Sequence, residues 1–250
     1  GQNIGITSGA ILLPFIALTF GYTYTFLIGG LIVLLIIIFP LLVKEYKIVK
    51  KRPKMVKLLF SEFKKKTTLL VSLFAPLAYM NCGILFFIIP IYLDIYLGLD
   101  ISQIGFITAI FTLAVAFGSI VGGAIADKLG RKNTLYIMLS TSIISSALLI
   151  YANNWQNFTI VYSAIGFLQG GMAASALAML MDITNPKIGA TQFSILTGLG
   201  NFGYLFAGAI SGSLYAMFGF SRVFLYAAWA FGPAILILYF IRLKSMRKNK

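Results

Sequence analysis

Four polar side chains stand inside otherwise apolar stretches of the chain, where a polar group needs a partner. Tyr79 and Asn81 lie near the middle of one such stretch, Gln169 lies in a second and Asn201 in a third. An amide in an apolar environment costs free energy unless it is hydrogen-bonded, so each amide must meet another helix, a ligand or water. Together the four side chains predict a substrate-binding site. Helix-to-helix hydrogen bonding is the alternative for each amide.

The residue types that catalysis usually requires are scarce. The chain has no histidine, a single cysteine, Cys82, and only 6 acidic residues, which are scattered among loops. Imidazole catalysis, His-ligated metals, an intrachain disulfide and a cysteine metal cluster are therefore excluded for this chain. A membrane-bound transferase would need carboxylates or histidines clustered near one membrane face. We expect no enzyme activity, no catalytic residue, no bound metal and no cofactor.

The elements that carry the four polar side chains are long apolar runs. The 250 residues are 60% hydrophobic and 10% charged, whereas an average soluble domain is about 25% charged. A helix needs about 20 apolar residues to cross a bilayer, and backbone groups in lipid must be bonded within the segment. The expected fold is an all-α, polytopic helical membrane bundle. Its eight predicted spans are residues 4–20, 24–43, 67–92, 101–125, 133–151, 158–181, 190–218 and 222–241.

The formal charge of +14 is distributed in a way that argues against a nucleic-acid partner. Every Lys and Arg lies between apolar runs or at the C-terminus, whereas a nucleic-acid-binding face would interleave basic residues with core positions. With eight spans, all of these charges except Arg222 fall on one side, which the positive-inside rule assigns to the cytoplasm. Both ends of the chain are thus predicted to be cytoplasmic, in an integral protein of the cell (plasma) membrane.

The basic stretch 44–66 mixes Lys with apolar residues at roughly helical spacing. One interpretation is a solvated connector whose charge only fixes the topology. The alternative is an amphipathic helix on anionic lipid headgroups, with Leu58, Leu59 and Phe63 dipping into the membrane. The lipid bilayer is a predicted partner of the chain in either case.

A glycine-rich, charged turn stands between the fourth and fifth runs, with the sequence GGAIADKLGRK over residues 122–132. Glycines let two helix ends meet closely, and opposite charges can form a latch at the membrane surface. This turn resembles the cytoplasmic loop signature of the major facilitator superfamily, G-x-[LI]-[AS]-D-[KR]-x-G-[KR]-[KR], with every fixed position filled. The matching residues are Gly123, Asp127, Lys128, Gly130, Arg131 and Lys132.

The resemblance implies a secondary transporter and places the chain within it. The family carries this loop after its second helix and, in a related form, after its eighth, and only four spans follow the loop here. The eight runs are therefore expected to be helices five to twelve of a twelve-helix protein, with four N-terminal helices as missing partners. The expected parts are 1–43 (last two helices of the N-terminal half), 44–66 (basic cytoplasmic linker), 67–241 (C-terminal six-helix half) and 242–250 (basic cytoplasmic tail).

For Asp127 the resemblance implies a gate. Its carboxylate is expected to meet the start of the eleventh helix and to pair with a base such as Arg131, which would hold the cytoplasmic side closed in one state. The expected partners at that helix start are Ala190, Thr191 and Gln192. Residues 181–193, with Ala-Thr-Gln followed by an aromatic, also resemble the loop before the eleventh helix in muropeptide permeases and acetyl-CoA transporters.

Two functions within transport stay open at this point. The first is a secondary active or facilitative transporter that moves a small-molecule substrate by rocker-switch alternating access. The second is a multidrug exporter, which would show a more aromatic and less amide-lined cavity. A membrane protein that transports nothing is a third option, against which the complete loop signature and the mid-depth amides weigh.

Overall fold

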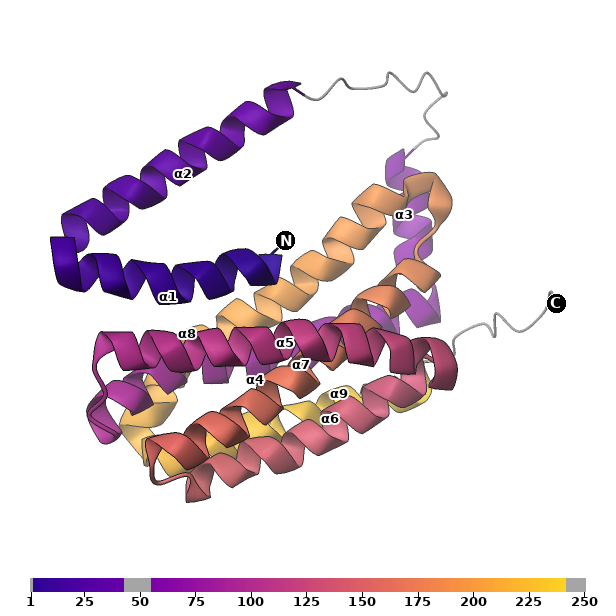
Figure 1. The fold of residues 1–250 in the computed structure, drawn as a ribbon. Coiled ribbons are helices and arrows are strands. Elements are labelled where there is room, and N and C mark those ends of the chain that lie inside the picture. The colour runs from indigo at the N-terminus through magenta and orange to yellow at the C-terminus, as the bar shows by residue number, and fades with distance from the viewer. Residues whose placement is uncertain (1, 43–54, 242–250) are drawn as a thin grey trace.

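The chain folds into a bundle of helices (Figure 1). A computed structural model describes residues 2–42 and 55–241, and the side chains of 5–38 and 55–241. The α-helices are α1 (Gln2–Phe20), α2 (Tyr22–Leu42), α3 (Met55–Phe63), α4 (Lys66–Ile91), α5 (Ile101–Leu129), α6 (Arg131–Leu148), α7 (Trp155–Ile183), α8 (Gly189–Trp229) and α9 (Phe231–Phe240). A π-helical turn at Tyr92–Tyr96 extends α4, and 3-10 turns lie at Leu149–Tyr151 and Pro186–Ile188.

The described helices other than α3 overlap the predicted spans. Within the part of the chain that the structure describes, five segments are long and apolar enough to cross a membrane, and two shorter apolar helices, Gly5–Phe20 and Tyr22–Ile38, precede them. The last segment, Pro186–Phe240, has 55 residues, which at 1.5 Å per residue is about 80 Å and more than twice a hydrocarbon core. Its backbone breaks at Gly219, where φ is 73°, and the chain reverses direction there (Figure 1). The break separates the predicted runs 190–218 and 222–241, so this segment supplies two spans.

The bundle is held by two pairs of closely packed helices, α4 with α8 and α5 with α7. Glycine permits the close approach at both contacts. A Cβ atom built on Gly118 of α5 would lie 2.0 Å from the carbonyl oxygen of Phe167, and one on Gly203 of α8 would lie 2.2 Å from that of Pro76. Real Cβ atoms cannot come so near, so only glycine fits at these places. Two clusters of buried apolar side chains fill the remaining space between the helices.

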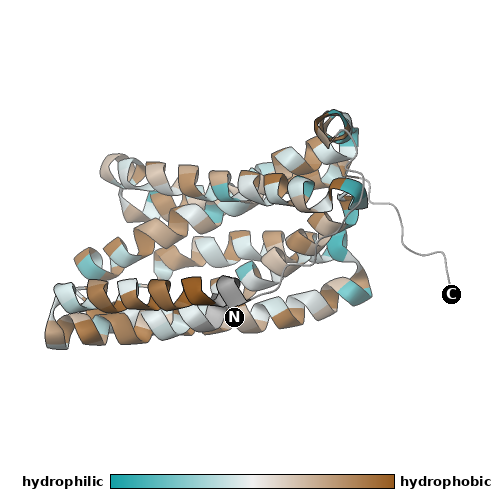
Figure 2. Cartoon of the chain, turned by 90° about the horizontal axis from the view of Figure 1, so that it is seen from above, coloured by the Kyte–Doolittle hydropathy of each residue, from teal (hydrophilic) through white to brown (hydrophobic). Residues whose placement is uncertain are grey.

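Helices α1 and α2 lie outside the two closely packed helix pairs. Helix α1 packs against α5, and α2 packs against α1. Apolar side chains of α2 such as Phe26 and Leu34 are 78% and 64% exposed. A helix that is apolar all round and exposed belongs in lipid or against further helices. Figure 2 shows the apolar colouring that continues along the helices, with hydrophilic residues concentrated near the helix ends.

The turn between α5 and α6 carries the charged motif. Gly130 ends α5 with φ of 87° and donates its backbone N–H to the Ala126 carbonyl oxygen at 2.9 Å. This left-handed conformation is easily adopted only by glycine, which explains why the motif needs one here. Helix α6 begins at the next residue, Arg131, so the basic side chains of the motif fall on its first turn.

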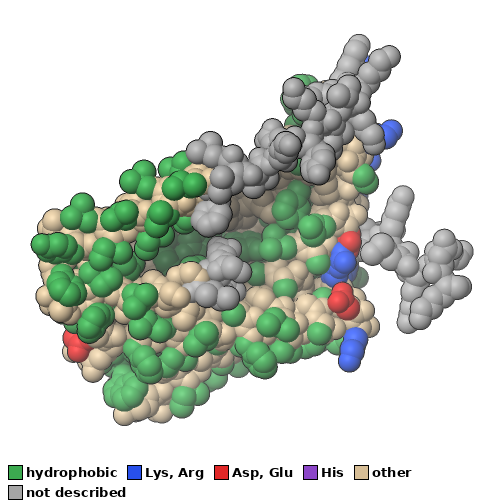
Figure 3. All heavy atoms as spheres, turned by 45° about the horizontal axis from the view of Figure 1, so that its top comes forward, with side chains coloured by type: hydrophobic (Ala, Val, Ile, Leu, Met, Phe, Trp, Pro, Cys, Tyr) green, Lys and Arg blue, Asp and Glu red, His purple; other side chains and the backbone are tan. Residues whose placement is uncertain are grey.

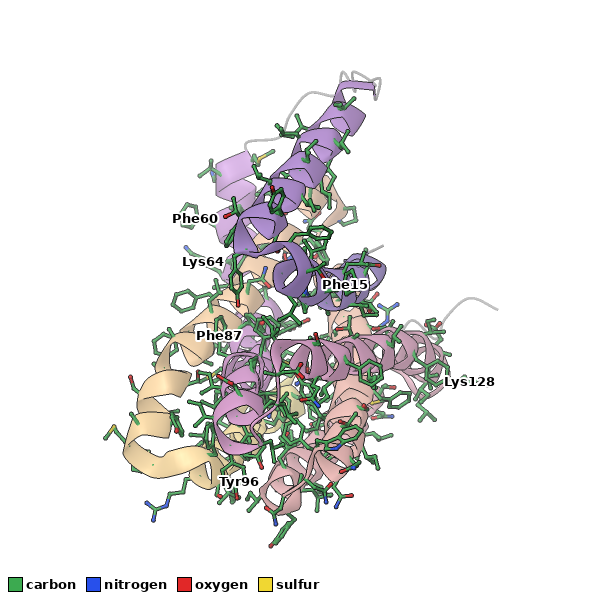
Figure 4. The ribbon with its side chains drawn as sticks, turned by 60° about the vertical axis from the view of Figure 1, so that its left-hand side comes forward. Phe15, Phe60, Lys64, Phe87, Tyr96 and Lys128 are labelled. Carbon is green, nitrogen blue, oxygen red and sulfur yellow. The ribbon has the colours of Figure 1, made fainter. Side chains whose placement is uncertain are left out.

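The described part of the linker is helical, but its outward-facing apolar side chains are not the predicted ones. Phe63 packs against the apolar core, and Leu58 and Leu59 are half-buried. This packing disagrees with the alternative in which these three residues dip into lipid, because the most exposed apolar residues of α3 are Val56 and Phe60, each 67% exposed. Phe60 and Lys64 project outward from the bundle in Figure 4. The predictions for residues 44–54 and for the tail 242–250 lie outside the described residues.

Candidate substrate-binding site

A cavity of about 420 Å³ opens between α4, α5, α7 and α8, next to α1. The helices that line it are those joined by the close glycine contacts, so its walls are fixed by the same packing that builds the bundle. The lining residues are Ile6, Tyr79, Cys82, Leu85, Phe86, Thr108, Phe111, Thr112, Val115, Tyr162, Gln169, Met172, Ala173, Asn201 and Tyr204.

Three of the four predicted site residues meet at this cavity. Tyr79 comes from α4, Gln169 from α7 and Asn201 from α8. Gln169 is buried, whereas Asn201 is exposed toward the open side. The structure thus brings together side chains that lie up to 122 positions apart, counting from residue 79 to residue 201. Their contact with a substrate stays a prediction.

Asn81 lies behind the cavity wall and does not line the cavity. Its side chain is fully buried, and its Nδ2 donates to the Ala227 carbonyl oxygen at 2.7 Å and to the Ser146 hydroxyl at 3.1 Å. Its Oδ1 accepts from Gln169 Nε2 at 3.2 Å. Both N–H groups of Asn81 are therefore engaged by protein. The expectation of direct substrate contact is corrected for Asn81: it joins helices, which was the alternative reading.

Aromatic and hydroxyl side chains of the cavity were missed at the sequence level. Tyr162 stands seven positions before Gln169 and Tyr204 three positions after Asn201, so each shares a helix face with a predicted residue. Thr108 and Thr112 are four apart on α5 and line the same wall. Helical spacing could have identified Tyr162 and Tyr204, because residues three, four or seven positions from a cavity amide lie on the same face of its helix.

The cavity is electrically neutral and aromatic. Among the described residues that line it, none is Asp, Glu, Lys or Arg. Phe111 stacks on Tyr162 with ring centroids 4.1 Å apart, and Phe86 meets Tyr204 at 5.7 Å. Such a surface binds apolar and aromatic groups by dispersion and stacking, and it can hold a cation against ring faces. The polar groups at hand are amides, phenols and hydroxyls, which bind a solute through hydrogen bonds.

The charged motif makes contacts other than the expected ones. Arg131 forms an ion pair with Asp182 at the end of α7 and donates to the Ala178 carbonyl oxygen at 2.8 Å. Lys132 donates to the carbonyl oxygens of Tyr239 and Ile241, at 2.9 and 2.7 Å. The motif thus ties the start of α6 to the ends of α7 and α9.

Asp127 does not make the predicted contacts in this conformation. It is exposed, and among the described residues its side chain has neither a hydrogen bond nor an ion pair, so this conformation contains neither the Asp127–Arg131 pair nor the contact with the start of α8. Gly123 has open space around it, and Lys128 is exposed at the end of α5 (Figure 4). Gating by these residues remains a prediction.

The start of α8 is held instead by α3 and the turn before it. Gln192 is fully buried, and its Oε1 accepts from the backbone N–H of Asn185 at 2.9 Å. Asn185 Nδ2 donates to Glu62 at 2.7 Å, and Glu62 pairs with Lys65 at 2.6 Å. Ala190 of the same helix start is exposed. The Thr191 hydroxyl lies 3.9 Å from the Met55 sulfur, which brings α3 against the first turn of α8 itself.

This docking of α3 should weaken in acid. Hydrogen bonds from Lys65 and Asn185 lower the pKa of Glu62 below its ordinary value of 4.5. A carboxyl whose pKa is lower in the docked state stabilises docking above the undocked pKa, and this stabilisation is lost as the pH falls through the docked pKa. We expect constant protection of α3 amides from pH 8 to about 5 and weaker protection well below pH 4.5, measured by hydrogen exchange corrected for intrinsic rates.

The Glu62→Gln variant is the matched control, because glutamine keeps the acceptor oxygen for Asn185 but cannot titrate. Its α3 protection should be weaker at neutral pH and independent of pH. If wild type and E62Q showed the same acid dependence, another group would control the docking.

Comparisons with known proteins agree with this architecture. The family model described as Major Facilitator Superfamily matches residues 71–250. The quinolone resistance protein NorA of Staphylococcus aureus (strain Mu50 / ATCC 700699) is 26% identical over 174 residues, which are 69% of this chain and 44% of that protein. The uncharacterized MFS-type transporter YttB of Bacillus subtilis (strain 168) is 25% identical over 150 residues, 60% of this chain and 37% of that one.

The fold is also similar to a solved structure. The crystal structure of a bacterial homolog of the human lysosomal transporter Spinster, in an inward-facing and unoccupied conformation, superposes with a TM-score of 0.52 at 15% identity, over 80% of this chain and 50% of that chain. The chain spans less than half the length of the curated relatives named here. These comparisons address the superfamily, so the finer resemblance to muropeptide and acetyl-CoA permeases stays a prediction.

Proposed function

The chain belongs to the Major Facilitator Superfamily, and we propose that the protein it forms moves an amphipathic, aromatic small molecule across the membrane by alternating access. The observation that carries this proposal is the neutral cavity between α4, α5, α7 and α8, walled by aromatic rings and hydrogen-bonding groups. Such a surface suits a solute with a flat apolar body and a few polar atoms. No step of transport breaks a covalent bond, so the proposal requires no enzyme chemistry.

Of the two transport functions, the geometry favours export of drug-like compounds over uptake of a polar solute. Five aromatic rings line the cavity, those of Tyr79, Phe86, Phe111, Tyr162 and Tyr204. Because Asn81 lies behind the wall, the amide side chains that line the cavity are those of Gln169 and Asn201. This is the aromatic, amide-poor lining expected of a multidrug exporter. The name of one relative, a quinolone resistance protein, points in the same direction.

The proposal includes further helices, because the chain alone has an open side. Helix α1 packs on α5 beside the cavity, and Ile6 of α1 contributes to the lining. We infer that α1 and α2 end a first half of the transporter, that residues 67–241 form its second half, and that four more helices complete the cavity. Residues 44–66 would then link the halves on the cytoplasmic side.

The distribution of charge supports a cytoplasmic placement of both chain ends, and the proposal places the protein in the plasma membrane. The Arg131–Asp182 pair and the Glu62–Lys65 pair lie at helix ends on the side that the positive-inside rule assigns to the cytoplasm. Figure 3 shows charged side chains at the ends of the bundle and hydrophobic side chains over the surface between them.

The test is transport by the natural gene product that contains this sequence, reconstituted in liposomes. We expect energised uptake or release of fluorescent aromatic dyes, with the rate reduced at least about tenfold in Asn201→Leu because the exposed cavity amide is lost. Phe202→Leu is the matched control: Phe202 is the next residue, is 64% exposed and does not line the cavity. It should transport at the wild-type rate.

Cys82 offers a second measurement in the same preparation. It is the single cysteine of the chain and lines the cavity, so a membrane-permeant maleimide should label it, once any cysteines outside this chain are replaced by serine. A transported dye should slow that labelling. If no dye were transported and none slowed the labelling, the proposed function would be overturned.

A further inference from the structure

The hydrogen bonds behind the cavity wall determine which end of the Gln169 amide faces the substrate. They begin at the Ala227 carbonyl oxygen, which can only accept a hydrogen bond. Asn81 approaches that oxygen at 2.7 Å and must therefore present its NH₂ group there. Its Oδ1 consequently points the other way, toward Gln169.

The orientation of the Asn81 amide determines the orientation of the Gln169 amide. Because Asn81 offers an oxygen, Gln169 must offer a donor, and its Nε2 does so at 3.2 Å. Gln169 Oε1 is then left for the cavity that this residue lines, and no described protein group donates to it. A carbonyl oxygen in an apolar site gains most when a ligand supplies the missing donor.

The neighbouring wall of the cavity, formed by α5, also presents hydrogen-bond acceptors, and different contacts cause this. Thr108 donates its hydroxyl hydrogen to the Ile104 carbonyl oxygen at 2.8 Å, and Thr112 donates to that of Thr108 at 2.8 Å. Both hydroxyls line the cavity with their hydrogens already used. Only their oxygen lone pairs remain for a ligand. Three acceptors therefore border the cavity from α5 and α7.

We propose that this wall selects solutes that carry an N–H donor on an aromatic body, and that Asn81 is the positioning residue that sets this preference by holding Gln169 Oε1 toward the cavity. The inference rests on the proposed function, since it names the class of solute that the same cavity takes. Asn81 itself touches no substrate. It acts through Gln169, and its own orientation is imposed by Ala227.

The test uses two cations of equal charge: an aromatic tertiary amine, protonated at neutral pH, and its quaternary analogue, in which a methyl group replaces the N–H hydrogen. Their dissociation constants are measured on the purified intact protein by ligand-induced thermal shift. We expect wild type to bind the tertiary amine about tenfold more tightly, as one hydrogen bond from a charged donor provides. Equal affinity of the two compounds would overturn the proposal.

Variants separate positioning from mere structural support. Asn81→Leu should reduce the preference to about twofold or less while still binding the quaternary analogue, since Gln169 is then free to rotate. Ser146→Ala is the matched control: it removes the other partner of the same Nδ2 group but leaves the Ala227 contact, and should keep the full preference. Retention of the full preference by N81L would contradict the positioning role.

A second variant covers the case in which N81L does not fold. Gln169→Met keeps the length of the side chain and removes its amide, and it should reduce the preference to about twofold or less without abolishing binding. If Q169M kept the preference, the acceptor would be elsewhere and the proposal would fail. Transport without a preference for N–H would overturn this inference alone, whereas a preference without transport would overturn the proposed function alone.

Discussion

Replacing Gly203 by valine is expected to prevent stable assembly of α4 with α8. A Cβ atom at this position would lie 2.2 Å from the Pro76 carbonyl oxygen and 2.5 Å from its Cα, and both are backbone atoms that no rotamer change can move. The two helices would have to separate along their contact and lose packing on both sides. Overpacking costs about 1–3 kcal/mol even where side chains can adjust, so we expect at least the upper end of that range.

The measurement is the yield of monodisperse protein and its melting temperature in detergent. Gly212→Val is the matched control, because Gly212 lies on the same helix, is exposed and has no neighbour within 4 Å of a built Cβ. It should behave as wild type apart from the small cost of valine in a helix. A G203V protein as stable as G212V would mean that α4 and α8 pack differently from this structure.

Reversing the charge of Arg131 is the second change with a large expected effect. Arg131 and Asp182 pair across the ends of α6 and α7, with side chains 24% and 25% exposed. Arg131→Asp would remove the ion pair and turn two carboxylates toward each other in a partly buried site, which we expect to cost roughly 2 kcal/mol and to lower transport about tenfold or more. Asp182→Arg should act similarly, through two facing guanidinium groups.

The double variant R131D/D182R should recover the stability. It restores opposite charges, and it also reverses their relation to the helix dipoles: Arg131 now stands at the start of α6 and Asp182 near the end of α7, each at the unfavourable end. Exchanging the two charges would make both interactions with the helix dipoles favourable, by about 0.3–1 kcal/mol each. Melting temperatures of the four proteins give the coupling energy. If the double variant were no more stable than the single ones, the pair would not hold α6 to α7.

Transport by the double variant separates two roles of the motif. If the pair only joins helices, the exchange restores transport together with stability. If Arg131 also takes part in gating through Asp127, as the family resemblance implies, stability returns and transport does not. The structure shows the first contact and, in this conformation, not the second.

The position of Asn81 illustrates what a sequence can and cannot determine about a polar residue in a membrane helix. Hydropathy located Tyr79 and Asn81 at the same depth of α4. At about 100° per residue, Asn81 is rotated about 200° from Tyr79, whereas Cys82 is rotated by about 300° and so shares its face. Helical spacing could therefore have separated Asn81 from the cavity, but only if the inward direction of Tyr79 had been known.

Composition and hydropathy along the chain are enough to predict the membrane-spanning helices, the reversal near Gly219, the charged turn of residues 122–132 and three of the cavity's polar groups. These features depend on local composition, because the lipid environment demands long apolar segments and confines charges to their ends. The packing of the helices was needed to show that Asn81 supports Gln169, that Arg131 pairs with Asp182, and that Thr108, Tyr162 and Tyr204 join the site. The rotation and pairing of helices are set by close backbone contacts at glycines such as Gly118 and Gly203, and those contacts depend on residues far apart in the chain.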